Sequence, residues 1–290
     1  MTQLIVSLLL AAGLGYATAL LAVRRQARDW PLRRTVFWFA GLAAAAVAVT
    51  GPPPGAAGHP MGGHHDLTAH MLTHLLLGMA APLLLVVAAP LTLALRALPT
   101  PYARRLSGLL GSAPVRAVTH PVTALILNAG GMWLLYTTGL YQVPGHQLHL
   151  LGAGYLFTAA VVGVDPASHR PGRRTRAVVL LVYLAAHSIL AKYLYGHPPA
   201  GVRPADGRSA AELMYYGGDL IDIALIAEFC RQWYAAGRPG HRRREHRAWR
   251  LPDDIRLGDA PSGAAVPTGT GWRTSGTAAT PHCAAHRPGR

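Results

Sequence analysis

Two histidines and a methionine stand at the head of a long apolar segment, DLTAHMLTHLLLGMAAPLLLVVAAPLTLAL at 66–95. His70 and His74 are four residues apart, so a helix places them on one face about one turn apart, with Met71 three residues before His74. Imidazole and thioether groups at this spacing can ligate a transition metal. From Leu75 onward twenty residues carry no charge, which is about the length that spans the hydrocarbon of a bilayer. The segment therefore predicts metal ligands at the end of a membrane-spanning helix.

Three later apolar segments carry further ionisable residues. His146 and His149 begin one segment, His187 lies inside the next, and Asp219 and Asp222 lie three residues apart in the last. Ionisable groups within a bilayer are costly and usually face the interior of the bundle, where they pair or bind something. If the faces that carry these residues converge, they form one polar site in the outer half of the bundle.

The side-chain types in this set point to copper. Imidazole suits copper, zinc and iron, and the thioethers of Met61, Met71 and Met214 favour copper among them because methionine is a soft ligand. An all-cysteine zinc site is excluded, because the chain has only two cysteines. The expected ligand set is His70, Met71, His74, His146, His149, His187, Asp219 and Asp222.

Each member of the set also has a purely structural explanation. An HxxxH pair near a membrane surface is often interfacial polarity, and HQLH at 146–149 could simply begin a helix. His187 could bond a backbone carbonyl in the core, and the two aspartates could satisfy helix ends or pair with Lys192. The common depth of ionisable residues on four segments favours a shared site. A haem-binding membrane oxidoreductase, with histidines as axial iron ligands, and a metal or proton transporter are the alternatives.

The composition predicts a membrane protein. Of the 290 residues, 51% are hydrophobic and 13% are charged, whereas about a quarter are charged in ordinary soluble domains. The predicted fold is an all-α bundle of seven transmembrane helices, at about 3–23, 35–50, 69–95, 117–139, 147–165, 176–195 and 213–234. Pro82 and Pro90 lie inside the third span, where a transmembrane helix tolerates them.

The positions of the arginines predict the orientation. Arginines gather in the connections after the first, third and fifth spans and after the seventh, whereas 51–68 and 140–146 carry neither Lys nor Arg. By the positive-inside rule, the N-terminus lies outside and the C-terminus is cytoplasmic. The histidine-bearing helix ends then lie on the outer side. We interpret the formal charge of +15 as a topology signal and expect no binding of nucleic acid.

The chain divides into a transmembrane domain and a tail. The domain is expected at 1–236, with a histidine-rich outer loop at 51–68. Residues 237–290 are rich in Arg, Pro, Gly and Thr with few large apolar side chains, so we expect a disordered basic cytoplasmic tail. Aromatic residues near helix ends, Tyr136 and Tyr141 among them, are expected to be interface anchors or packing groups.

The order of residues is distinctive in three motifs: HMLTHLLLGMAAPLLLVVAAPL at 70–91, GLYQVPGHQLHLLGAGYLFTAAVVGVDP at 139–166 and DLIDIALIAEFCRQW at 219–233. In these motifs the chain resembles the CtaG family of cytochrome c oxidase assembly factors, the multi-pass type of Gram-positive bacteria. The resemblance covers most of residues 67–234. The histidine motifs of that family map onto His70, His74, His146 and His149, and its acidic motif maps onto Asp219 and Asp222.

The resemblance implies a seven-helix protein of the plasma membrane that helps to assemble the caa-type terminal oxidase by delivering or inserting copper. It implies oxidase subunits as partners, with a copper donor protein as a further candidate. We expect copper to be captured on the outer side by the loop and the helix that carries His70 and His74, and to pass by ligand exchange to an oxidase subunit. Because no covalent bond of a substrate changes, we do not expect an enzyme.

Overall fold

The computed structural model describes residues 2–51, 67–165, 170–199 and 201–237, and these residues form helices and no strand. All of them belong to the first of two units into which the chain divides, Met1–His241 and Arg242–Arg290. The all-α prediction is therefore confirmed for the described part. Most of the histidine-rich loop, at 52–66, and the predicted tail from 238 onward lie outside the described residues.

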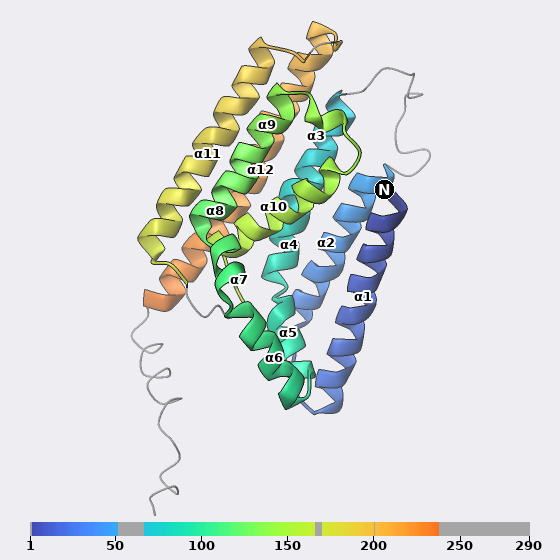
Figure 1. The fold of residues 1–290 in the computed structure, drawn as a ribbon, viewed down its shortest axis with the longest axis vertical. Coiled ribbons are helices and arrows are strands. Elements are labelled where there is room, and N and C mark those ends of the chain that lie inside the picture. The colour runs from blue at the N-terminus through green and yellow to red at the C-terminus, as the bar shows by residue number, and fades with distance from the viewer. Residues whose placement is uncertain (1, 52–66, 166–169, 200, 238–290) are drawn as a thin grey trace, which may run out of the picture. The chain divides into compact units, whose positions relative to one another are not determined.

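The helices of the first unit run up and down beside one another (Figure 1). Helices α1 (Thr2–Arg25) and α2 (Leu32–Thr50) form an antiparallel pair at one edge. Their lower ends are joined by an aromatic contact, in which the indole of Trp30 donates a 2.9 Å hydrogen bond to the hydroxyl of Tyr16. The Tyr16 ring also stacks on Trp38, with 4.8 Å between centroids. The hydrogen bond pairs the buried Trp30 indole, whereas Nε1 of Trp38 is buried without a hydrogen-bond partner in the described structure.

The third segment is one continuous helix with a widened turn in its middle. It consists of α3 (Leu67–His74), the π-helical turn η1 (Leu75–Ala80) and α4 (Ala81–Val87). Pro82 has no N–H to bond the carbonyl four residues before it, and a π-turn in front of it accommodates the missing bond without ending the helix. The widened turn comes directly after His74, so it sets the direction in which that side chain points.

The structure corrects the predicted end of this span. The sequence predicted a helix to residue 95 through Pro90, but α4 ends at Val87 and α5 begins at Pro90 and ends at Ala97. Proline disfavours the helical conformation in the residue before it, and Ala89 takes a left-handed conformation with φ of 55°. Proline is well suited to the first position of a new helix. Pro82 is tolerated inside the helix, whereas Pro90 breaks it.

Three short helices follow, where the sequence predicted the last residues of the third span, up to 95, and then a connection up to 117. They are α5, α6 (Thr100–Leu110) and α7 (Ala113–Val118). The carboxylate of Asp165, far along the chain, accepts hydrogen bonds from the backbone N–H of Leu91 (3.2 Å) and Thr92 (2.7 Å). This carboxylate satisfies otherwise unpaired donors at the start of α5 and fixes the bend after α4.

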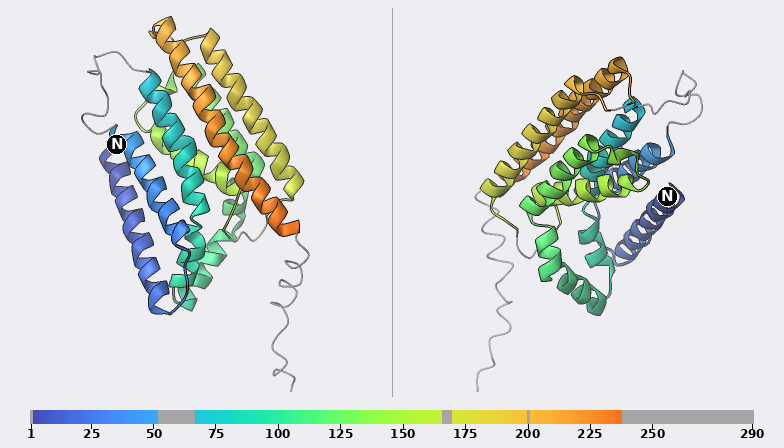
Figure 2. Two further views of the ribbon diagram at one scale, coloured as in Figure 1. Left: turned by 180° about the vertical axis from the view of Figure 1, so that it is seen from behind. Right: turned by 45° about the horizontal axis from the view of Figure 1, so that its top comes forward.

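The remaining elements are α8 (Pro121–Leu125), the π-turn η2 (Ile126–Gly130), α9 (Gly131–Thr137), the 3-10 turn η3 (Leu140–Gln142), α10 (His146–Val161), α11 (Arg173–Gly196) and α12 (Pro204–Gly237). The run α8–η2–α9 is again continuous. Helices α11 and α12 pair along their length at the edge opposite α1, and α10 crosses the bundle at an angle (Figure 2).

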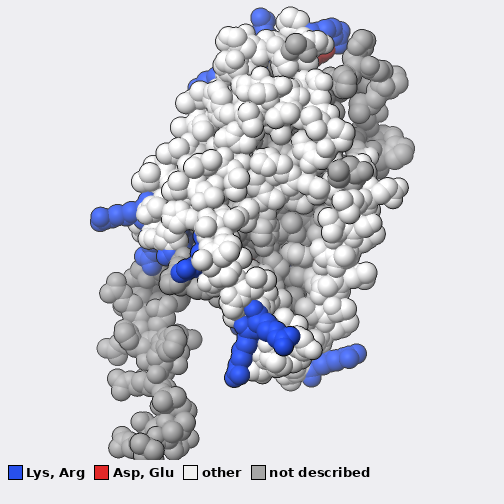
Figure 3. Space-filling view, viewed as in Figure 1, with Lys and Arg blue, Asp and Glu red and all other residues white. Residues whose placement is uncertain are grey.

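Four helical segments of the described chain are long and apolar enough to cross a bilayer: Thr2–Arg25, Leu32–Thr50, Leu67–Val87 and Arg173–Gly196. On the face shown in Figure 3, a broad region has no charged side chains, and Lys and Arg lie mainly below it. Both features are those of a membrane protein, because charged side chains are expelled from hydrocarbon.

Helix α10 approaches η1 closely. A Cβ added at Gly154 would overlap the carbonyl oxygen of Gly78 and lie 3.0 Å from Cγ of Pro82. Backbone and proline ring cannot move aside as a flexible side chain can. Glycine at 154 is therefore what allows α10 to lie against the helix that carries His70 and His74.

We predict that Gly154→Ala lowers the melting temperature of the detergent-purified protein by several degrees, corresponding to about 1–3 kcal/mol for an overpacked contact. Gly152→Ala on the same helix is the matched control, because nothing lies within 4 Å of a Cβ placed there. Equal melting temperatures for the two variants would contradict the close approach of α10 and η1.

Candidate functional site

A row of four imidazoles and one carboxylate extends from one end of the bundle into its interior. The ring centroids of His146 on α10 and His70 on α3 are 5.1 Å apart. One turn further along α3, the His74 ring lies 6.0 Å from that of His187 on α11. Nδ1 of His187 is 3.9 Å from Oδ2 of Asp222 on α12. Four helices therefore bring predicted site residues into one continuous row.

The inner half of this row is removed from solvent. His74 and His187 are each 1% exposed and Asp222 is 4% exposed. Both ring nitrogens of His74, Nε2 of His187 and Oδ1 of Asp222 are buried without a hydrogen-bond partner in the described structure. Each buried polar atom left unpaired costs about 1–3 kcal/mol. These atoms have free capacity to bind a proton, a water molecule or a metal ion.

Two tyrosines hold the outer half of the row. Oη of Tyr136 lies 3.2 Å from Nε2 of His70, and the ring of Tyr141 lies 5.2 Å from the His70 ring. Both tyrosines are buried, at 3% and 6% exposure, so of the two roles predicted for them they are packing groups and not interface anchors. The hydrogen bond to His70 was not predicted, because Tyr136 lies 66 residues further along the chain.

Three predicted ligands, His149, Asp219 and Met71, are not part of the row. The His149 ring lies against α9, where a Cβ on Gly131 would come within 2.8 Å of its Cε1 atom. Asp219 is half-buried one turn before Asp222 and has no ion pair in the described structure. Met71 is fully buried in the core. No three His, Cys, Asp or Glu side chains of the described residues lie close enough to hold one metal ion, so the row consists of pairs and not of a cage.

The structural explanations considered for His187 and Asp222 do not describe their positions. His187 makes no hydrogen bond to a backbone carbonyl in the described structure, and its nearest charged group is Asp222. Lys192 does not pair with either aspartate, because its side chain is directed to the Tyr215 ring, 5.4 Å from the centroid. The pairing of His187 with Asp222 is thus a specific feature of the bundle.

A small cavity of about 10 Å³ lies beside Asp222. Its polar wall is formed by Asp222, Asn128, Thr158 and Tyr183, which come from four different helices. This volume is about enough for one water molecule. The sequence signal for these partners is weak, since Asn128 and Thr158 are uncharged polar residues among mostly apolar neighbours.

Glycines let the buried rings approach the helices. A Cβ on Gly218 of α12 would lie 3.1 Å from Nδ1 of His187, and one on Gly78 would lie 3.3 Å from Nδ1 of His74. Any larger residue at 218 would press on the ring of His187. Gly218 on α12 and Gly78 in the π-turn therefore define the space in which the two imidazoles face each other.

The family of the chain follows from comparison with known proteins. The family model described as cytochrome c oxidase caa3 assembly factor (Caa3_CtaG) matches residues 14–236. The chain belongs to this family. Every member of the histidine row lies within the matched region, so the Caa3_CtaG assignment confirms the resemblance drawn from the three sequence motifs.

Curated relatives of this Caa3_CtaG chain occur in mycobacteria. It is 38% identical over 189 residues to "Uncharacterized protein Mb0105" of Mycobacterium bovis and equally to "Uncharacterized protein MT0111" of Mycobacterium tuberculosis. It is 32% identical over 191 residues to "Uncharacterized protein ML1998" of Mycobacterium leprae. These matches cover 58%, 58% and 61% of this chain but only 28% of each relative. No solved structure matches the chain.

We predict that His187 and Asp222 are energetically coupled. His187→Leu leaves the Asp222 carboxylate buried without its neighbour and should lower the melting temperature, whereas His187→Leu/Asp222→Leu should lower it less because no unpaired polar group remains. The coupling is expected to be about 1–3 kcal/mol in a double-mutant cycle. Additive effects of the two single substitutions would show that the 3.9 Å contact has no energetic role.

Proposed function

We propose that this Caa3_CtaG protein assists assembly of a cytochrome c oxidase by binding copper with the histidine row and passing it to an oxidase subunit. The observation that carries the proposal is the inner pair, in which His74 and His187 face each other with three of their ring nitrogens buried and unpartnered. A buried donor set with no internal partner is suited to an ion that arrives from outside.

The residues present fit copper better than a metal that needs four protein ligands. Two imidazoles that share a metal at about 2 Å from each nitrogen bring their ring centroids to about 5–6 Å, and the two pairs measure 5.1 and 6.0 Å. Copper(I) accepts low coordination numbers and soft ligands. Met71 follows His70 in the sequence, and its thioether is the soft ligand type that copper(I) prefers, although its side chain is buried in the hydrophobic core. Zinc in a structural site would require four ligands.

The two histidine pairs have different proposed roles, one in capturing the metal and one in holding it. His70 and His146 are half-buried at the end of α3 and α10, so they are accessible for capture. His74 and His187 are buried one turn further in, next to Asp222, whose carboxylate would balance the charge of the ion. Because each histidine pair would supply only two imidazole ligands, the metal could exchange from one pair to the other and on to a partner protein. No covalent step is needed, so the proposed role is that of a carrier and not of an enzyme.

The proposed setting is the plasma membrane, with seven helices crossing it. The three segments that would join the four long apolar helices are α8–α9, α10 and α12. The arrangement supports the orientation predicted from sequence, because successive connections alternate between the two ends of the bundle (Figure 1). The arginine-rich connections then share the cytoplasmic side, and the N-terminus, His70 and His146 share the outer side.

The proposed partners follow from this orientation. The lipid bilayer surrounds the bundle, an apo-oxidase subunit would dock laterally near the outer end of α3, and a copper donor protein would approach from the outside. A haem-binding oxidoreductase would be recognised by a Soret band. A transporter would be recognised by metal uptake into vesicles.

We predict that the anaerobically copper-loaded protein retains near-stoichiometric copper and that His70→Ala/His74→Ala loses it. The control is His120→Ala/His197→Ala, because Nδ1 of each of these histidines already contacts the backbone, at Val122 N and Tyr193 O. Metal content and an absorption spectrum of the detergent-purified proteins check the prediction. Copper retained by the first double variant would contradict the site, and a Soret band would indicate haem.

We predict opposite labelling of the two ends of the bundle. In a Cys230→Ser/Cys283→Ser background, Val143→Cys should react with a membrane-impermeant maleimide on intact cells, and Ser107→Cys on α6 should react only after the cells are opened. Both positions are exposed. Labelling of Ser107→Cys in intact cells would overturn the proposed orientation.

A further inference from the structure

A second polar site lies at the other end of the bundle, away from the histidine row. A cavity of about 330 Å³ is enclosed by the segment before α11, the first turn of α11 and the last turns of α12. This volume lies in the range of small-molecule sites. It is lined by Arg170, Pro171, Gly172, Arg173, Arg176, Phe229, Gln232 and Trp233. Three arginines and no acidic residue of the described chain line it.

Arg176 is the unusual member of this group. It is 6% exposed, and its Nε atom is buried without a hydrogen-bond partner. Its guanidinium lies over the Phe229 ring, 5.3 Å from the centroid, and it forms no ion pair within the described residues. Arginine remains charged in proteins, and a buried charge is costly unless an opposite charge accompanies it. A cavity with such an arginine in its wall is suited to an anionic ligand.

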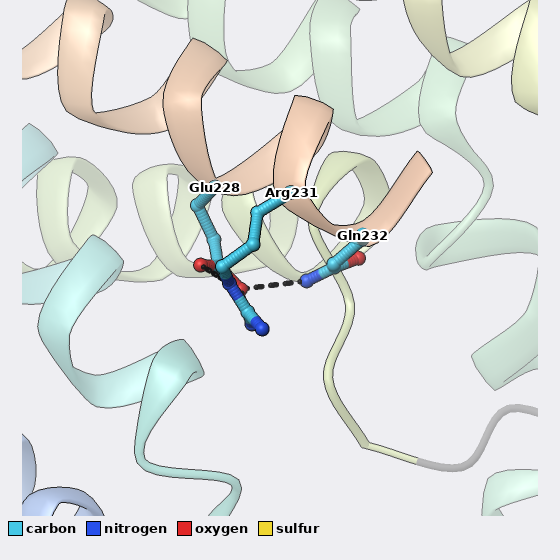
Figure 4. Close-up of polar contacts among 3 residues, drawn as sticks. All are labelled: Glu228, Arg231 and Gln232. Atoms are coloured by element: carbon cyan, nitrogen blue, oxygen red, sulfur yellow. Dashed lines mark hydrogen bonds and ion pairs between the residues drawn. The ribbon is translucent and has the colours of Figure 1, made fainter. Parts of the chain in front are cut away.

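The acidic groups near the cavity are already engaged. Glu228 accepts hydrogen bonds from Arg231, at 2.6 Å from its Nε, and from Gln232, at 3.0 Å (Figure 4). The Asp165 carboxylate accepts hydrogen bonds from backbone N–H groups at the start of α5 and from the hydroxyl of Thr92, the last at 2.6 Å. Arg170 itself donates to the backbone carbonyl of Asp165. Neither acid is thus available to Arg176.

The surroundings indicate which anion would enter. Arg173 begins a helix that is long and apolar enough to cross a bilayer, so the cavity lies at the depth of lipid headgroups. Trp233, 40% exposed, lines it, and tryptophan is enriched at this depth. The N-terminus of α11 adds its partial positive charge. Basic pockets between transmembrane helices on the cytoplasmic side suit anionic headgroups.

We infer that this cavity binds the phosphate group of an anionic phospholipid, with Arg176 as its buried anchor and Arg170 and Arg173 at its mouth. The lipid supplies an opposite charge to Arg176, which has no ion pair among the described residues, and holds α11 to α12 at the cytoplasmic surface. This inference rests on the proposed membrane orientation but not on copper binding, because Arg176 precedes His187 by about three turns of α11 and Phe229 follows Asp222 by about two turns of α12.

The test is thermal unfolding of the full chain in a nonionic detergent, with added phosphatidylglycerol or phosphatidylcholine. Phosphatidylglycerol at about 100 times its dissociation constant should raise the melting temperature of the wild type by about 5 °C, and phosphatidylcholine should raise it much less. Arg176→Met should abolish the gain yet melt no lower than the wild type without lipid, because it removes an unpaired buried charge. Arg174→Met, in the same turn but exposed and outside the cavity, should keep the gain.

Four results would overturn the inference. Equal gains with both lipids would show that the headgroup charge is not read, and an equal loss in Arg174→Met would show that only overall charge matters. A full gain from millimolar inorganic phosphate alone would indicate a site for a free anion. A lower melting temperature of lipid-free Arg176→Met would show that Arg176 already has a partner, such as an acidic residue of the chain beyond 237. Arg173→Gln, at the exposed mouth, provides a second variant and should weaken lipid binding severalfold.

Discussion

The structure depends on the cost of burying polar groups in an apolar helical bundle. His74, His187 and Asp222 are withdrawn from solvent, yet four of their polar atoms lack a hydrogen-bond partner. Such a row persists only if the packing of the helices around it stabilises the fold by more than the row costs, or if a ligand supplies the missing partners. This constraint links the fold to the proposed carrier function, because a site that is incomplete by itself would gain stability from an ion bound there.

The packing that holds the row is built on small residues and prolines. Gly154 and Gly218 allow α10 and the His187 ring to approach neighbouring helices without overlap. Pro82 accompanies the π-turn directly after His74, and π-turns are frequent at functional sites. These glycines and this proline help to bring polar side chains close to partners that lie far away in the sequence. The glycines therefore contribute to the site by position, although they offer no ligand.

Much of this arrangement could be predicted from the sequence, since apolar spans and ionisable residues at a common depth indicated a helical bundle with His70, His74, His187 and Asp222 inside. The rest depends on helix rotation and tilt, which hydropathy does not contain. The position of His149 against Gly131 and the contact of Tyr136 with His70 both arise from such rotation. Local rules explain the break before Pro90, yet the same rules apply to Pro82, and only packing separates the two.

We propose that buried imidazoles of this bundle hold copper. X-ray absorption spectroscopy of the copper-loaded full chain tests it most directly, with wild type and His187→Ala measured side by side. We expect imidazole scattering from nitrogen at about 2 Å in the wild type, with a clear loss of that signal in the variant. Copper surrounded only by sulfur, or an imidazole signal that does not change in His187→Ala, would contradict it.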